Sequence, residues 1–136
     1  MLETTIVNRL SEVARVAELI DRFGAEHHLA RGVLADIQVA LDEVLTNIIN
    51  YAYADNAEHE IRICFEVLGN MLEAVIEDDG MPFDPLASPA PDVSAPLHER
   101  RVGGVGLHFV RNLMSEVTYD RVGNRNRLVL KKQLTT

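Results

Sequence analysis

Residues 41–52 read Leu-Asp-Glu-Val-Leu-Thr-Asn-Ile-Ile-Asn-Tyr-Ala, and this stretch decides how the rest of the chain is organised. Apolar residues recur at three- and four-residue spacing from Leu34 to Ala52, as they do on the buried stripe of an amphipathic helix. The pattern therefore predicts a long central helix from about residue 31 to residue 54.

A second, polar stripe runs along the same predicted helix. Glu43, Asn47 and Asn50 stand at positions i, i+4 and i+7, so their side chains are neighbours on one helix surface. A carboxylate can take a proton from a nucleophile, and an amide oxygen is a hard ligand suited to Mg²⁺. The alternative is a solvated polar stripe without chemistry, which amphipathic helices commonly carry.

Length and charge limit the classes of protein to consider. With 136 residues the chain is long enough for one domain, expected over residues 1–136, and too short for two ordinary ones. A net charge of −8 argues against a nucleic-acid partner. No apolar run reaches the roughly 18 residues of a membrane span, and no signal peptide is recognisable, so we expect no membrane and a cytoplasmic location.

The remaining patterns predict an α+β domain. Extended structure is expected at residues 2–7, a hairpin at 60–77 with its turn at Gly69-Asn70, and a second hairpin near residues 117–130 with its turn at Gly123-Asn124. A first amphipathic helix should cover residues 10–23, with Asn8 or Ser11 as its cap and its end near Gly24.

A segment of different character separates the two hairpins. All five prolines lie between residues 82 and 96, a density that excludes helix and central strand. The segment ends at Arg100 and Arg101, and the glycine-rich stretch 103–106 then opens another helix. Glycines at a helix start let the backbone approach a phosphate, and the arginines add positive charge, although many glycine clusters are only turns.

The stretch Asp78-Asp79-Gly80 follows the second strand of the first hairpin. An aspartate there can accept a hydrogen bond from an exocyclic amino group such as that of adenine. The commoner use of this sequence is an acidic turn.

The order of these pieces is more specific than any one of them. Glu43-x-x-x-Asn47 on a helix, Asp78-x-Gly80 after a strand and Gly104-x-Gly106 opening a helix resemble the N, G1 and G2 boxes of the GHKL ATPase superfamily. The resemblance covers residues 31–132. The small size and the spacing of Glu43 from Asn47 look most like the RsbW-type anti-sigma factor serine/threonine kinases.

This resemblance implies a fold and a set of roles. The fold would be a two-layer sandwich of the Bergerat type, with helices on one face of a mixed, mostly antiparallel sheet. Glu43 would be the general base, Asn47 the Mg²⁺ ligand and Asp78 the reader of adenine, beneath a lid over about residues 81–103. The residues placed at ATP would be Asn47, Asn50, Asp78, Gly80, Arg100, Arg101, Gly103, Gly104, Val105, Gly106 and Leu107.

The resemblance also implies partners and a reaction. The protein would phosphorylate a small STAS-type antagonist and sequester a sigma factor, and relatives are often homodimers. The alternatives are a module that binds ATP and a partner without transferring phosphate, and a detached histidine kinase catalytic domain. Tyr51 stands where many relatives have histidine, and the spacing does not decide whether Arg100 or Arg101 meets the phosphates.

Overall fold

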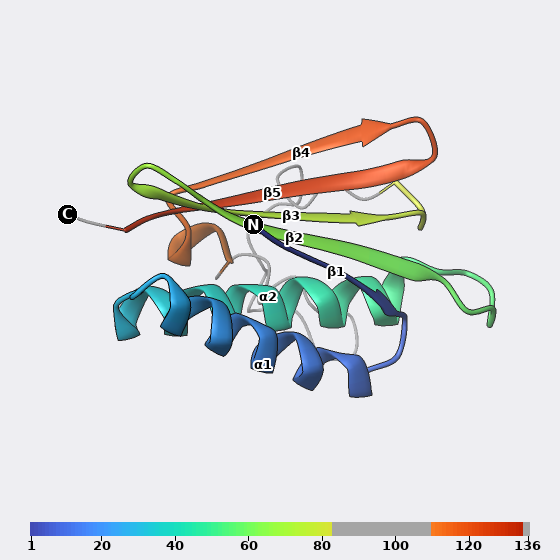
Figure 1. Cartoon of the computed structure of the whole chain (residues 1–136). Coiled ribbons are helices and arrows are strands. Elements are labelled where there is room, and N and C mark those ends of the chain that lie inside the picture. Colours follow the sequence, from blue (N-terminus) through green and yellow to red (C-terminus); the bar gives the residue numbers. More distant parts are fainter. Residues whose placement is uncertain (83–109, 135–136) are drawn as a thin grey trace, which may run out of the picture.

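The described part of the chain contains five antiparallel strands with helices α1 and α2 on one face, and a short helical segment at residues 110–113 (Figure 1). The computed structural model describes residues 1–82 and 110–134. Strands lie in the order β1-β2-β3-β5-β4, and this confirms the predicted α+β class. The elements are β1 (Leu2–Val7), α1 (Ser11–Glu26), α2 (Arg31–Tyr51), β2 (Glu60–Leu68), β3 (Met71–Asp78), β4 (Glu116–Val122) and β5 (Arg125–Gln133).

The core lies between the sheet and the helices. The period-two alternation of β2 directs Ile61, Ile63 and Phe65 toward the helices, and each is no more than 1% exposed. The predicted apolar stripe of α2 meets them, with residues such as Leu41 and Leu45 fully buried. The central helix ends at Tyr51, three residues earlier than the sequence pattern predicted.

The first helix continues past the glycine that was expected to end it. Gly24 lies inside α1, and a Cβ added to it would stand 2.9 Å from Leu34 Cδ1 of α2. The glycine therefore serves the close approach of two helices and does not terminate one. The left-handed residue that follows the helix is His28, with a φ of 54°.

The predicted cap of α1 is also wrong. Leu10 stands at the cap position and no side chain caps the helix. Asn8 instead joins β1 to the segment before β2: its Oδ1 accepts from the His59 amide at 2.9 Å, and its Nδ2 donates to the Ala57 carbonyl at 3.3 Å. The Asn8 side chain therefore binds the distant residues Ala57 and His59 instead of capping the helix that follows it.

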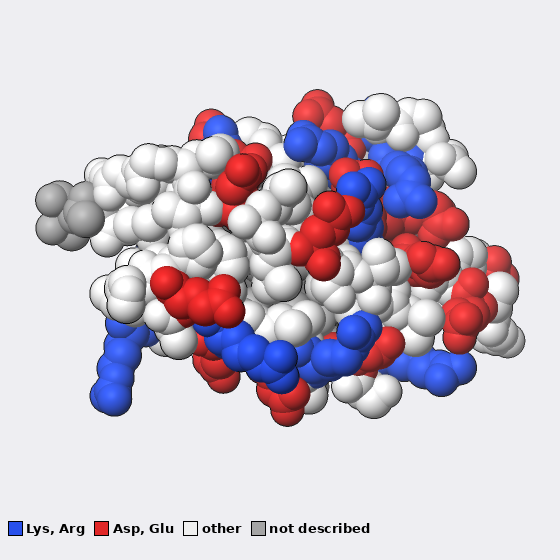
Figure 2. All heavy atoms as spheres, in the orientation of Figure 1, with Lys and Arg blue, Asp and Glu red and all other residues white. Residues whose placement is uncertain are grey.

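The outer face of the sheet carries no helix in the described residues and is mostly polar, apart from a central row of Cys64, Val75 and Val129. Register places Arg62 opposite Glu77, Glu77 opposite Arg127, and Arg127 opposite Asp120, so neighbouring strands present opposite charges. Figure 2 shows acidic and basic side chains interleaved over one side of the molecule. This outer face can meet water, which makes a two-layer arrangement sufficient.

The proline-rich segment and the glycine cluster fall in residues 83–109, outside the described residues. The expected lid and Arg100, Arg101 and 103–107 are therefore not placed. Val110 and Met114, just after this segment, are buried. No helix of the described residues has the length and hydropathy needed to cross a membrane.

Candidate functional site

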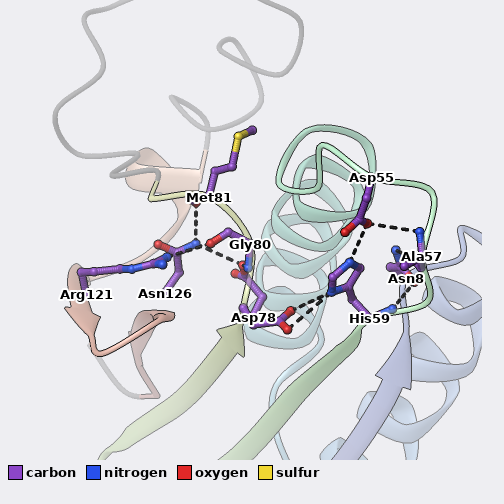
Figure 3. Close-up of polar contacts among 10 residues, drawn as sticks. Asn8, Asp55, Ala57, His59, Asp78, Gly80, Met81, Arg121 and Asn126 are labelled. Atoms are coloured by element: carbon purple, nitrogen blue, oxygen red, sulfur yellow. Dashed lines mark hydrogen bonds and ion pairs between the residues drawn. The ribbon is translucent and has the colours of Figure 1, made fainter.

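Asp78 is the last residue of β3 and points toward the helix layer. It continues the inward series Leu72, Ala74 and Ile76, so the alternation that builds the core also buries this carboxylate, which is 3% exposed. Its Oδ1 accepts from the Gly80 amide at 2.8 Å and from Asn126 Nδ2 at 3.1 Å (Figure 3). Oδ2 takes no part in these two bonds.

Gly80 lies against the end of α2. A Cβ at this position would stand 2.6 Å from Ala52 Cβ and 2.7 Å from the Ala52 carbonyl oxygen. The same carbonyl accepts from the Met81 amide at 2.8 Å. Gly80 is required because no side chain fits there, and its role is to seat the turn after β3 on α2.

The C-terminal hairpin holds the same turn from its other side. Arg121 of β4 donates to the Gly80 carbonyl at 2.8 Å, and Asn126 of β5 donates to the Met81 carbonyl at 2.8 Å (Figure 3). Sequence reasoning missed both residues. The signal for Asn126 was present, because it shares an inward series with Leu128 and Leu130, where a polar residue needs a polar partner.

Burial dominates the electrostatics of this site. It raises the pKa of the Asp78 carboxyl, and the hydrogen bonds from Asn126 and the Gly80 amide act in the opposite direction. Burial, with the nearby Asp78 charge, also raises the pKa of Tyr53. The Tyr53 hydroxyl is enclosed and has no hydrogen-bond partner in the part of the chain that the structure describes.

His59 closes the site on the side of β2. Its ring stacks on Tyr53 with centroids 4.2 Å apart, and its two nitrogens face Asp55 Oδ1 at 2.7 Å and Asp79 Oδ1 at 3.2 Å. The hydrogen bond to Asp55 raises the pKa of His59, and Asp79 adds to this. The loop before β2 is thereby tied to the acidic end of β3.

The polar stripe of α2 lies where the sequence predicted it. Glu43 and Asn47 are half-buried and Asn50 is exposed. Asn47 Nδ2 donates to the Glu43 backbone carbonyl at 2.7 Å, which turns the amide nitrogen to the helix and its oxygen away from that carbonyl. At about 1.5 Å of rise per residue, Asn47 lies about 7.5 Å and Glu43 about 13.5 Å along the axis from Ala52.

This arrangement places polar groups along α2 that an elongated nucleotide could meet. A buried carboxylate marks one end, at the Ala52–Gly80 contact, and an amide oxygen and a second carboxylate follow along α2. No cluster of three or more His, Cys, Asp or Glu side chains that could hold a metal occurs among the described residues. Mg²⁺ fits a different donor set, one or two protein oxygens completed by phosphates and water, and Asn47 supplies such an oxygen.

A buried carboxylate beside a helix with a polar stripe is compatible with a nucleotide-binding ATPase domain, and the family match shows that class. The histidine kinase-like ATPase domain family matches residues 6–132. Because the match covers nearly the whole chain, the chain belongs to that family. Membership in a family of ATPase domains implies the use of ATP. It also confirms the resemblance to the GHKL ATPase superfamily that was drawn from the N, G1 and G2 boxes.

Similar proteins of known name give a finer comparison. The chain is 34% identical over 90 residues to the serine-protein kinase RsbW of Oceanobacillus iheyensis, covering 62% of this chain and 56% of that relative. It is 34% identical over 92 residues to RsbW of Staphylococcus epidermidis, covering 62% and 57%. The chain thus spans little more than half the length of these relatives.

A solved structure shows the same fold. The RsbU and RsbW domains of Rv1364c from Mycobacterium tuberculosis superpose with a TM-score of 0.67 at 16% identity, covering 98% of this chain and 31% of that chain. At this identity the likeness concerns the fold alone.

Proposed function

We propose that the chain is an ATP-dependent serine/threonine protein kinase of the partner-switching type, acting in the cytoplasm. It would phosphorylate a small STAS-type antagonist and hold a sigma factor while the antagonist is phosphorylated. The observation that carries the proposal is the contact of the turn after Asp78 with Ala52, at the end of the helix whose polar stripe carries Asn47 and Glu43. The similarity to RsbW kinases supports the choice of substrate class.

Each end of the site has a role in this proposal. Asp78 Oδ2 would accept from the amino group of adenine, which a guanine base lacks at that position. Toward the phosphates, Asn47 would hold Mg²⁺ through its amide oxygen. Bound Mg²⁺ would neutralise charge on the phosphates. Residues 81–103 would form the lid, with Asn50, Arg100 or Arg101, and residues 103–107 at the nucleotide, within one ATPase domain over residues 1–136.

Glu43 would act on the substrate hydroxyl. It lies one helical turn before Asn47, so its carboxylate would face the same cavity as the phosphates that Asn47 serves. A serine hydroxyl that attacks the γ-phosphorus must release a proton, and the Glu43 carboxylate would accept it. A positioned general base contributes roughly 10²–10⁴-fold in rate.

The alternative function is a module that binds ATP and a partner without phosphoryl transfer. A carboxylate at position 43 favours the kinase, because binding alone needs no base there. A homodimer is a further expectation from the relatives.

The test is transfer of labelled phosphate from ATP to any STAS-type protein that a flanking gene encodes. Glu43→Gln keeps the shape of the side chain but removes its basicity, so ATP affinity should stay within about threefold, below about 0.7 kcal/mol. Transfer should fall by at least about a hundredfold. Asp42→Asn is the matched control, because Asp42 is exposed on the same helix and its substitution removes the same charge as Glu43→Gln.

Undiminished transfer by Glu43→Gln would place the base elsewhere. Native protein that binds ATP but transfers nothing to any flanking-gene partner would establish the binding module.

A further inference from the structure

The amide of Asn126 has one orientation that satisfies its surroundings. Its nitrogen lies 3.1 Å from Asp78 Oδ1 and 2.8 Å from the Met81 carbonyl oxygen, and its own oxygen lies 2.5 Å from the Tyr119 hydroxyl. A carboxylate and a carbonyl only accept hydrogen bonds, so the NH₂ group must face them. The Tyr119 hydroxyl then donates to the remaining oxygen and opposes a flip of the amide.

The strand register brings these groups together. Asp78 and Asn126 are direct partners across β3 and β5, and Tyr119 of β4 is the partner of Leu128, the next inward residue on β5. Asn126 is 6% exposed, so its amide is withdrawn from water together with the carboxylate it meets. A hydrogen bond to a charged group in such a place is stronger than its equivalent in water.

We propose that Asn126, oriented by the Tyr119 hydroxyl, is a positioning residue that fixes the Asp78 carboxylate for recognition of an adenine amino group. The inference rests on the proposed ATP site. The Asn126 NH₂ group favours the ionised form of Asp78, which is the form that accepts from an amino group. The same NH₂ group binds the Met81 carbonyl, so the carboxylate and the turn after it are held in one fixed relation.

The first experiment needs no nucleotide. The carboxyl carbon of Asp78 is followed through a pH titration by ¹³C NMR of aspartate-labelled protein and is assigned with Asp78→Asn. Asn126→Ala should move the midpoint of Asp78 upward, because the ionised form loses a donor. Tyr119→Phe should move it upward by less, because the amide remains but can rotate.

Thr118→Val is the matched control, since Thr118 is an exposed neighbour of Tyr119 on the outer face of the same strand. Asp79 and Arg121, the other charged groups that act on Asp78, and Tyr53, whose pKa Asp78 raises, are unchanged in all three variants.

The second experiment measures ATP and GTP affinity by calorimetry between pH 6 and pH 8. Asn126→Ala should weaken ATP binding about tenfold at pH 7 and narrow the preference for ATP over GTP. The loss of ATP affinity in Asn126→Ala, relative to the native protein, should grow as the pH falls, because a larger fraction of Asp78 is protonated in the variant. Comparing variant with native protein at each pH removes the titration of ATP itself. A purely structural role would lower affinity equally at every pH.

The outcomes separate the two proposals. Native protein that binds no ATP refutes the proposed function, while the NMR titration still decides the role of Asn126. An unchanged Asp78 midpoint in Asn126→Ala overturns the positioning role. If Asn126→Ala does not fold, Tyr119→Phe provides the test. An Asp78 titration midpoint in Tyr119→Phe equal to the midpoint in Thr118→Val then overturns the proposal.

Discussion

Replacing Gly80 with alanine tests the contact that seats the turn after β3 on α2. The new Cβ would lie 2.6 Å from Ala52 Cβ, 2.7 Å from the Ala52 carbonyl oxygen and 2.9 Å from Asp78 Oδ1. Ordinary carbon contacts stand at about 3.5–4.0 Å, so the turn must shift by about 1 Å. Overpacking of this kind costs about 1–3 kcal/mol.

The shift also strains the Met81–Ala52 hydrogen bond, which contributes about 0.5–1.5 kcal/mol. Together these terms predict a loss of about 1.5–4.5 kcal/mol of unfolding free energy. For a domain of this size that is roughly 5–22 °C in melting temperature. Nucleotide binding should fall as well, because the turn carries Asp78.

Thermal unfolding followed by circular dichroism measures the effect, with Gly32→Ala as the control. Gly32 lies in the first turn of α2 with nothing within 4 Å of its would-be Cβ, so alanine there should be neutral or stabilising. Adding Ala52→Gly removes the nearest clashing atom and should recover part of the loss, with a coupling of at least about 0.5 kcal/mol. A melting temperature for Gly80→Ala equal to that of the native protein, or zero coupling, would refute the reasoning.

Three further changes probe the rest of the site. Burial raises the pKa of Asp78 in the folded protein. The stabilisation that this shift gives to the fold is therefore complete at pH values below the ordinary pKa of aspartate, and it is lost as the pH rises through the raised pKa. The melting temperature of Asp78→Asn relative to native protein should therefore increase from pH 4.5 to pH 8, even as ATP binding is lost, and a pH-independent difference would contradict this. Because the pKa of His59 is raised in the folded protein, His59 stabilises the fold below about pH 6.5, and this stabilisation is lost as the pH rises through the raised pKa. His59→Gln should thus lower the melting temperature more at pH 6 than at pH 9, and equal losses would exclude the ion pairs as the cause. Asn47→Ala should lose most magnesium-dependent ATP binding in calorimetry while remaining folded, whereas an unchanged titration would remove Asn47 from the site.

The sequence predicted most of the fold because its elements are built from strong periodic patterns. Strand β2 was predicted at its observed bounds, and the stripe of α2 faces the core as its spacing indicated. The errors came where a tertiary contact outweighed a local preference. Gly24 sits in a helix because Leu34 packs over it, and Asn8 binds across to His59 instead of capping a helix.

The candidate site was predicted in part, for a similar reason. Asp78 and Gly80 were found because they form a short motif in one stretch of chain. Arg121 and Asn126 were missed because their partners lie more than forty positions earlier, at Gly80 and Asp78. Only the pairing of β3 with β5 brings them together, and no local pattern specifies which strands become neighbours.

The strand order has a consequence for the synthesis of this protein on the ribosome. Strand β5 is made after the other four strands of the described sheet, yet it lies inside that sheet between β3 and β4. Until residues 125–133 have left the exit tunnel, the nascent chain exposes an unpaired edge of β3, and Asp78 lacks the amide that meets it. Since long-range strand pairing is slow, this interval favours aggregation. A nascent chain therefore gains the Asn126–Asp78 hydrogen bond, on which the proposed reading of adenine depends, in the same step that closes the sheet.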